Sequence, residues 1–140
     1  AAGEGTMLRD DRQLALSAAI EACLHAAHVH EDGTQLLGDD TVGLRQLAAA
    51  RRGDAEKLAE HLRRLGDLPP EPDPEYEVAA DVISHIKGVL ADDDRRQALE
   101  RSNAAEEALA AALREALPQD LPPDCRRDIE RILSSQVQLA

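Results

Sequence analysis

Histidine and glutamate side chains recur at helical spacing near the start of the chain. Glu21, His25 and His28 are separated by four and then three residues, so they line one side of a helix. Imidazole and carboxylate groups together suit zinc, iron or nickel. The three residues lie roughly 80–140° from the apolar stripe through Leu16 and Ile20, on the flank or outside of a bundle. We therefore interpret them as exposed or rim side chains, with a surface metal held between molecules as the functional alternative.

Charged residues also fall within the apolar stripes. Glu31 lies about 20° from the centre of the stripe on the first helix, and Arg51 occupies the middle of the stripe on the second. An unpaired charge facing a core costs several kcal/mol, so each needs a partner. We expect Glu31 and Arg51 to pair across the first hairpin, with Glu106 and Ser102 from the third helix joining them in one polar layer.

This polar layer has two interpretations. One is a buried ion-pair network that fixes the register of the helices. The other is an altered pocket for a divalent metal (iron, manganese or zinc) formed by Glu31 and Glu106 with His28 or His61. Arg51 argues against the metal, because its fixed cation occupies the place that a metal would take. His61 and His85 lie at the edges of their stripes, where a histidine is more often a boundary residue than a ligand.

The composition favours an all-α fold. The chain has 140 residues, the size of one domain, and Tyr76 is its only aromatic residue. A core must therefore be built from Leu, Ala, Ile and Val, and the long runs of Ala and Leu favour helix. β-branched residues are too scattered to indicate a sheet. We expect a flexible leader over residues 1–9 and a single helical domain over residues 10–140.

Apolar spacing and helix-terminating residues predict four main helices. Asp10 or Asp11 caps the first, and Gly66 ends the second. The third begins at Asp92–Asp94, and the fourth has Pro122 or Pro123 in its first turn and runs to the end of the chain. The predicted spans are about 10–37, 42–65, 92–117 and 123–140, with a break at Gly38–Thr41 and a loop at 118–123.

A proline-rich stretch, Leu68–Pro74, separates the two halves of the chain. Its four prolines forbid helix and predict a stiff, extended crossover. A further helical segment over about Glu75–Leu90 precedes the third helix, which we therefore expect to be broken or kinked. Two hairpins joined by one long crossover are typical of an antiparallel, ferritin-like four-helix bundle.

Helix lengths and loop residues over about residues 20–140 resemble a bacterial family. The matching stretches are 44–48 with 51–52, 58–66 with 68–69, 86–90 with 94–95, 106–109 with 116–117, and 121–122. They resemble ferritin-like four-helix bundles classed as a domain of unknown function, relatives of rubrerythrins and stress-induced proteins. The resemblance implies a ferritin-like bundle and a stress-related role. Di-iron members need a Glu-x-x-His motif on each of two helices, and this chain has none, so ferroxidase or peroxidase activity is not implied.

The net charge, the apolar runs and the cysteines indicate which partners, which compartment and which thiol roles to expect. The formal net charge of −12 repels a phosphate backbone, which disfavours nucleic-acid binding. No run of about 18 apolar residues predicts a membrane span, and no signal peptide is visible, so cytoplasm is the default expectation. Cys23 and Cys125 match no metal motif and fall on apolar stripes, which indicates buried thiols.

Three functional hypotheses follow, and none is an enzyme with a recognisable nucleophile or phosphate-binding loop. The leading one is a non-catalytic interaction protein that self-associates, as a homodimer, through its Ala-rich helices. The second is a metal-binding ferritin-like protein that uses inward Glu and His residues. The third is a carrier with a small-ligand pocket in the bundle core.

Overall fold

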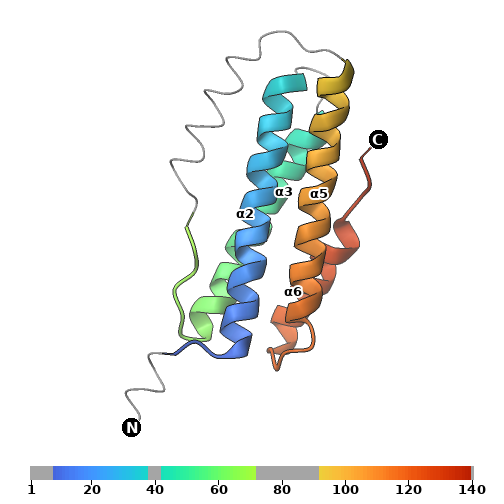
Figure 1. Cartoon of the computed structure of the whole chain (residues 1–140). Helices are drawn as coiled ribbons and strands as arrows, with labels where there is room; N and C mark the ends of the chain where they lie inside the picture. Colours follow the sequence, from blue (N-terminus) through green and yellow to red (C-terminus); the bar gives the residue numbers. More distant parts are fainter. Residues whose placement is uncertain (1–7, 38–41, 72–91, 140) are drawn as a thin grey trace.

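The computed structural model describes residues 8–37, 42–71 and 92–139 (Figure 1). These ranges contain four α-helices and no strand, as the all-α prediction requires: α2 (Asp11–Leu37), α3 (Val42–Arg64), α5 (Asp92–Ala116) and α6 (Pro123–Ser135). The first three predicted spans agree with the structure to within one residue at each end. Four predicted features lie wholly or partly outside the described residues: the leader (1–7), the break at 38–41, the end of the crossover (72–74) and the segment 75–90 with His85.

The helix ends form where local chemistry satisfies the backbone. Asp10 Oδ1 accepts a hydrogen bond from the Gln13 N–H, and Gln13 Oε1 accepts one from the Asp10 N–H, both 2.9 Å, which makes a reciprocal cap for α2. Gly66, at φ 86°, ends the helical turn after α3, and the Asp67 N–H bonds back to the Leu62 carbonyl at 3.2 Å. Pro123 opens α6, where a missing N–H costs nothing.

The prediction that the last helix runs to the end of the chain is wrong. Helix α6 ends at Ser135, and Gln136 has extended backbone angles (φ −73°, ψ 137°). The Ser135 hydroxyl donates to the Ile132 carbonyl at 2.6 Å, a local bond that competes with helix continuation. Residues beyond it bond instead to α5, so the tertiary partner outweighs the helical pattern.

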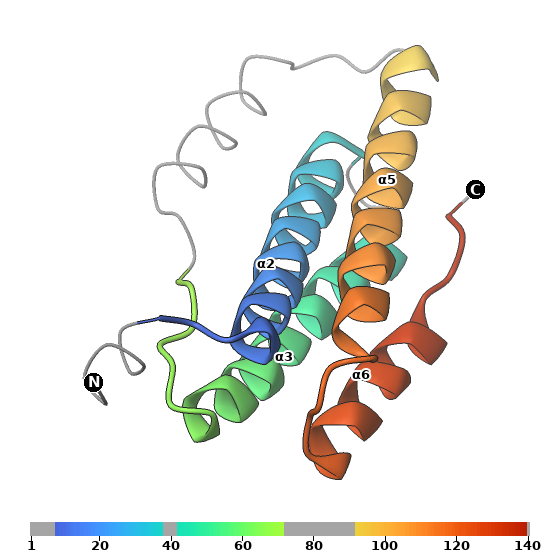
Figure 2. The same ribbon diagram turned by 60° about the horizontal axis from the view of Figure 1, so that its bottom comes forward.

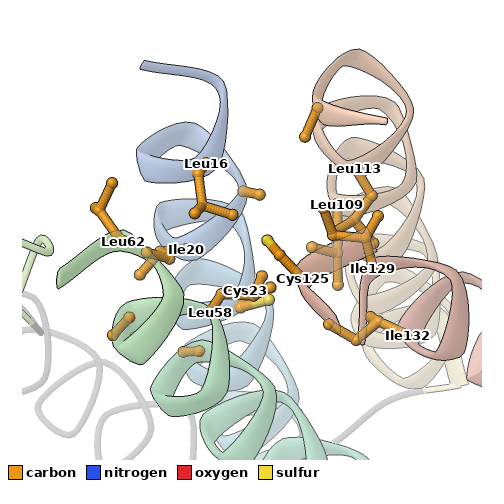
Figure 3. Close-up of a cluster of buried hydrophobic side chains, with 14 of the residues drawn as sticks. Leu16, Ile20, Cys23, Leu58, Leu62, Leu109, Leu113, Cys125, Ile129 and Ile132 are labelled. Carbon is orange, nitrogen blue, oxygen red and sulfur yellow. The ribbon is translucent and has the colours of Figure 1, made fainter. Parts of the chain in front are cut away.

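The helices surround one shared core. Helix α2 packs against α3 and α5, and the shorter α6 contacts α3 and α5, so α2 and α6 lie on opposite corners (Figures 1 and 2). Apolar side chains from all four helices converge in a large cluster, with Leu16 and Cys23 from α2, Leu58 from α3, Leu109 from α5 and Ile129 from α6 (Figure 3). A smaller cluster forms around Leu37, Leu44 and Ala98.

Buried positions along the helices repeat every seven residues. On α2 they include Leu16, Cys23, His30 and Leu37, and on α3 Leu44, Arg51 and Leu58. A seven-residue repeat keeps one seam facing the partner helix, as in coiled coils. Two members of this repeat, His30 and Arg51, are polar. Both lie between the two apolar clusters, so a polar layer interrupts the core.

Candidate functional site

Arg51 is the centre of the polar layer, at 1% exposure. Its Nη2 donates to Glu106 Oε1 at 2.6 Å and its Nε to Glu106 Oε2 at 2.9 Å, a two-pronged bond between α3 and α5. Its Nη1 donates to Asp54 Oδ2 at 2.8 Å and to Ser135 Oγ at 3.1 Å. All three guanidinium nitrogens are therefore bonded inside the fold, which offsets the cost of burying the charge.

Glu106 is shared between two cationic or protonatable partners. His30 Nε2, on α2, lies 2.9 Å from Glu106 Oε2, and because a carboxylate only accepts, Nε2 is the donor. Burial raises the pKa of Glu106, but the hydrogen bonds from His30 and Arg51 and the charge of Arg51 outweigh it and lower the pKa to about 2. Glu106 is thus a carboxylate over the whole physiological pH range.

The network continues outward through Asp54. Asp54 Oδ1 accepts from Arg131 of α6 at 3.3 Å, while Oδ2 accepts from Arg51. The result is an alternating series, from Glu106 through Arg51 and Asp54 to Arg131, that connects α5, α3 and α6. Because opposite charges alternate, each buried ion has a neutralising neighbour.

Two buried polar atoms of this layer have no hydrogen-bond partner among the described residues: His30 Nδ1 and Ser102 Oγ. Both residues are fully buried. The bare backbone of Gly33 faces Ser102, since a Cβ at Gly33 would lie 3.8 Å from Ser102 Oγ. Burying these atoms unbonded costs about 1–3 kcal/mol each, unless ordered water fills the gap.

The structure pairs two members of the predicted polar layer and buries a third near them. Arg51 and Glu106 are paired, and Ser102 is buried one helical turn from Glu106. The predicted pairing of Glu31 with Arg51 is wrong. Glu31 bonds to Arg52 instead (2.6 and 2.7 Å), and its side chain is 41% exposed.

His30 and Asp54 belong to the layer, and the interpretation of the sequence missed both. A straight helix of 3.6 residues per turn drifts about 20° per heptad from a seam that repeats every seven residues. Over the two heptads from Leu16, a straight helix of 3.6 residues per turn therefore places Glu31 toward the core and His30 away from it. The seven-residue repeat of the packed helices reverses this placement. The seven-residue series Leu16, Cys23, His30, Leu37 is the signal that identifies the inward histidine.

The residues predicted as metal ligands do not form one site. Glu106 is bonded to His30 and Arg51, and Glu31 to Arg52. His61, on α3, lies 2.6 Å from Asp128 of α6, and His28 is buried elsewhere on α2. Within the ranges 8–37, 42–71 and 92–139, no three His, Cys, Asp or Glu side chains are grouped so as to hold a metal ion. Glu21 and His25 are exposed, as expected, but the expectation of an exposed or rim position for His28 is wrong, because its side chain is buried.

The His61–Asp128 pair borders a shallow groove of about 280 Å³ between α3 and α6. Asp128 is also approached by Arg131, at 3.7 Å, and Arg64 pairs with Asp124 at 3.1 Å on the same surface. Burial raises the pKa of Asp128, but the hydrogen bond and charge of His61 dominate and lower it. The groove therefore holds mutually neutralised charges rather than a single strong field.

The two cysteines are free and buried, as the sequence indicated. Burial raises the pKa of Cys23 to about 12 and that of Cys125 to about 11. Thiols with such high pKa values are poor nucleophiles near neutral pH.

No helix in the described part of the chain is long and apolar enough to cross a membrane. Comparisons with models of known protein families, with curated proteins and with solved structures found no match for the chain.

Proposed function

We propose that the chain is a non-catalytic, ferritin-like helical bundle that associates with a second copy of itself through the surface where α2 meets α5. The proposal rests on a row of exposed small and apolar side chains along this junction. On α2 they include Leu14, which is 49% exposed, and Ala18, and on α5 Ala104 and Ala108. Small residues allow two helices to approach closely, and a contiguous apolar surface is typical of an interface.

Two shallow grooves lie along the same α2–α5 junction. One, of about 630 Å³, is lined by residues that include Leu14, Ala15, Ala18 and Pro118. The other, of about 330 Å³, has Val29, Ala104 and Ala108 in its lining. The grooves are bordered by charges of both signs, such as Asp32 and Arg101 in the second. An apolar centre with a charged rim supports association with a symmetric partner, in which each patch meets its own copy.

The order of the helices supports the ferritin-like, antiparallel arrangement. In Figure 1 the chain ascends along α2, descends along α3 and α5, and ascends along α6. The closely packed pairs α2–α3, α2–α5, α3–α6 and α5–α6 then run in opposite directions, while α3 and α5, which the Arg51–Glu106 bond connects, run in the same direction. An up-down-down-up order needs one long connection between the second and third helices, as in ferritin-like folds.

The saturation of the central charges supports a non-catalytic role. Arg51 donates hydrogen bonds to Glu106, Asp54 and Ser135, and Glu106 also accepts one from His30. A catalytic acid, base or metal ligand needs an accessible lone pair or proton, and this layer is closed to solvent. Its groups therefore suit the positioning of helices better than chemistry.

Multi-angle light scattering across a concentration series tests the proposal. We expect the unsubstituted chain to approach twice the monomer mass at high concentration. Ala108→Glu adds a charge to the α2–α5 surface and is expected to give a monomer. Ala50→Glu adds the same charge at an exposed position on α3 and is the matched control, expected to keep the dimer. A chain that stays monomeric at all concentrations, or that responds equally to both variants, contradicts the proposal.

A further inference from the structure

The segment after α6, residues 136–139, is bonded to α5 through the backbone of Leu139 and the side chain of Gln136. Asn103 Nδ2 donates to the Leu139 carbonyl and Asn103 Oδ1 accepts from the Leu139 N–H, both at 2.8 Å. Gln136 Nε2 donates to the Glu106 carbonyl at 2.7 Å. The side-chain amide of Asn103 thus satisfies both backbone polar groups of Leu139. This contact recognises a peptide backbone whatever its sequence.

The side chain of Leu139 supplies the selective part of the contact. It packs against the smaller apolar cluster formed by Leu37, Leu44 and Ala98, with Leu99 beside it. These residues come from α2, α3 and α5, so the cluster is built by the bundle and not by the segment itself. A backbone clamp next to an apolar pocket is the arrangement by which proteins bind extended peptides, with affinity from the main chain and selectivity from the side chain.

The segment fills this surface incompletely. A groove of about 260 Å³ lies alongside it, lined on α5 by residues that include Glu107, Ala110 and Arg114. Val137 borders the groove and remains 59% exposed, so it does not fill the groove. A peptide with a larger contact area than Gln136–Leu139 therefore has room to make contacts that the chain's own segment does not.

We propose that the surface around Asn103 is a recognition site for an extended segment of a partner protein that carries a leucine or similar aliphatic side chain. The chain's own Leu139 occupies this site as an intramolecular competitor. Three residues connect it to α6, and so short a link gives an effective concentration in the millimolar range or above. A partner segment displaces it by filling the groove over Ala110 and by packing an aliphatic side chain against the smaller apolar cluster. Asn103 and Ala110 line another groove than Ala104 and Ala108 of the α2–α5 surface, and Arg114 borders grooves of both surfaces.

Fluorescence anisotropy with the full chain tests the site. The probe is a fluorescein-labelled, C-terminally amidated peptide with the sequence of residues 134–139. Leu139→Asp weakens the intramolecular competitor, so we expect this variant to bind the probe at least about tenfold more tightly than the unsubstituted chain. Adding Asn103→Ala to it removes two hydrogen bonds and is expected to reduce binding about tenfold or more. Adding Gln97→Ala, at an exposed amide on the same helix, is the matched control and is expected to leave binding unchanged.

A second measurement does not depend on any variant that opens the site. In the unsubstituted chain, the Leu139 amide is expected to be protected from hydrogen exchange, and Asn103→Ala is expected to remove that protection. The proposal is overturned by an unprotected Leu139 amide. It is also overturned if the Leu139→Asp chain, with an unchanged circular dichroism spectrum, fails to bind the probe at about 1 mM. Equal binding by the variants with and without Asn103 has the same consequence.

Discussion

Arg51 of α3 and Glu106 of α5 form a two-pronged ion pair inside the bundle, with Nη2–Oε1 and Nε–Oε2 distances of 2.6 and 2.9 Å. The pair lies between a large apolar cluster that contains Leu58 and a small one that contains Leu44. Well-packed apolar residues in place of a buried ion pair are often equally stable, so stability alone does not account for such a layer. We infer that it restricts the register of the helices, because sliding α3 by one turn would separate Arg51 from Glu106 and Ser135, its partners on the other helices.

Removal of the Arg51 charge is expected to be strongly destabilising. Arg51→Met keeps the length of the side chain but leaves Glu106 and Asp54 buried without their shared cation. Breaking a buried pair in this way costs about 3–5 kcal/mol. Urea denaturation followed by circular dichroism measures the difference in the free energy of unfolding.

Arg52→Met is the matched control for that substitution. Arg52 is the neighbouring residue and also forms a two-pronged bond, but with Glu31, and both side chains are more than one-third exposed. Exposed pairs contribute about 1 kcal/mol or less. Similar losses in the two variants would show that the buried layer has no special energetic role.

The stability that Glu106 contributes is expected to depend on acid pH. The pKa of this carboxyl falls from 4.5 to about 2 on folding, because the bonds from His30 and Arg51 outweigh burial. Between these values the unfolded chain binds a proton that the folded chain does not, so acid favours unfolding. The contribution is complete above about pH 4.5 and disappears as the pH falls to about 2.

The comparison of the unsubstituted chain with Glu106→Gln isolates this effect from other carboxyl groups. Unfolding free energies are measured by urea titration at intervals from neutral pH down to about pH 2. The difference between the two proteins is expected to shrink as the pH falls through this window. A difference that stays constant would mean that the carboxylate of Glu106 does not titrate in the fold as its partners require.

The helices were predictable from sequence because their ends are determined locally. The cap at Asp10 with Gln13 and the glycine at Gly66 act within a few residues, so short-range patterns reveal them. The end of α6 was not predictable in this way. Leu139 is bonded to Asn103, thirty-six residues away in sequence, and a helical pattern carries no information about that partner.

The polar layer was predictable only in part, for a geometric reason. Arg51 stands out because a charge interrupts a run of apolar residues, and Glu106 follows as its acidic partner across the bundle. To predict that His30 points into the core, one needs the seven-residue period that packed helices adopt instead of the 3.6-residue period of an isolated helix. The choice between Arg51 and Arg52 as the partner of Glu31 depends on the same small rotation.

The two cysteines are expected to react slowly with thiol reagents in the folded protein. The pKa of Cys23 rises from 9.0 to about 12, which lowers its thiolate fraction at about pH 8 by about a thousandfold. The pKa of Cys125 rises from 9.0 to about 11, which lowers its thiolate fraction by about a hundredfold. Labelling with an aromatic disulfide reagent, followed by absorbance, is expected to be fast in urea and slow without it. Cys125 is expected to react before Cys23. Rapid labelling of either thiol under native conditions would contradict their placement in the core.

Glycine-to-alanine substitutions at Gly33 and Gly53 are expected to differ, although both residues lie inside helices. Alanine stabilises a helix interior by about 0.5–1 kcal/mol relative to glycine. A Cβ at Gly53 meets nothing within 4 Å, so Gly53→Ala is expected to give the full gain. A Cβ at Gly33 would lie 3.3 Å from Leu44 Cδ1, closer than ordinary contact, so Leu44 must shift within the smaller apolar cluster.

The gain at Gly33 is therefore expected to be reduced or reversed, because the shift of Leu44 disturbs a well-packed region. Thermal unfolding of the two single variants and of the unsubstituted chain measures the difference. Leu44→Val, made together with Gly33→Ala, removes part of the obstructing side chain and is expected to make the added methyl group less costly than in the single variant. Since the two residues are in contact, the double variant should depart from the sum of the single effects. Strict additivity would show that α2 and α3 do not approach each other closely at Gly33.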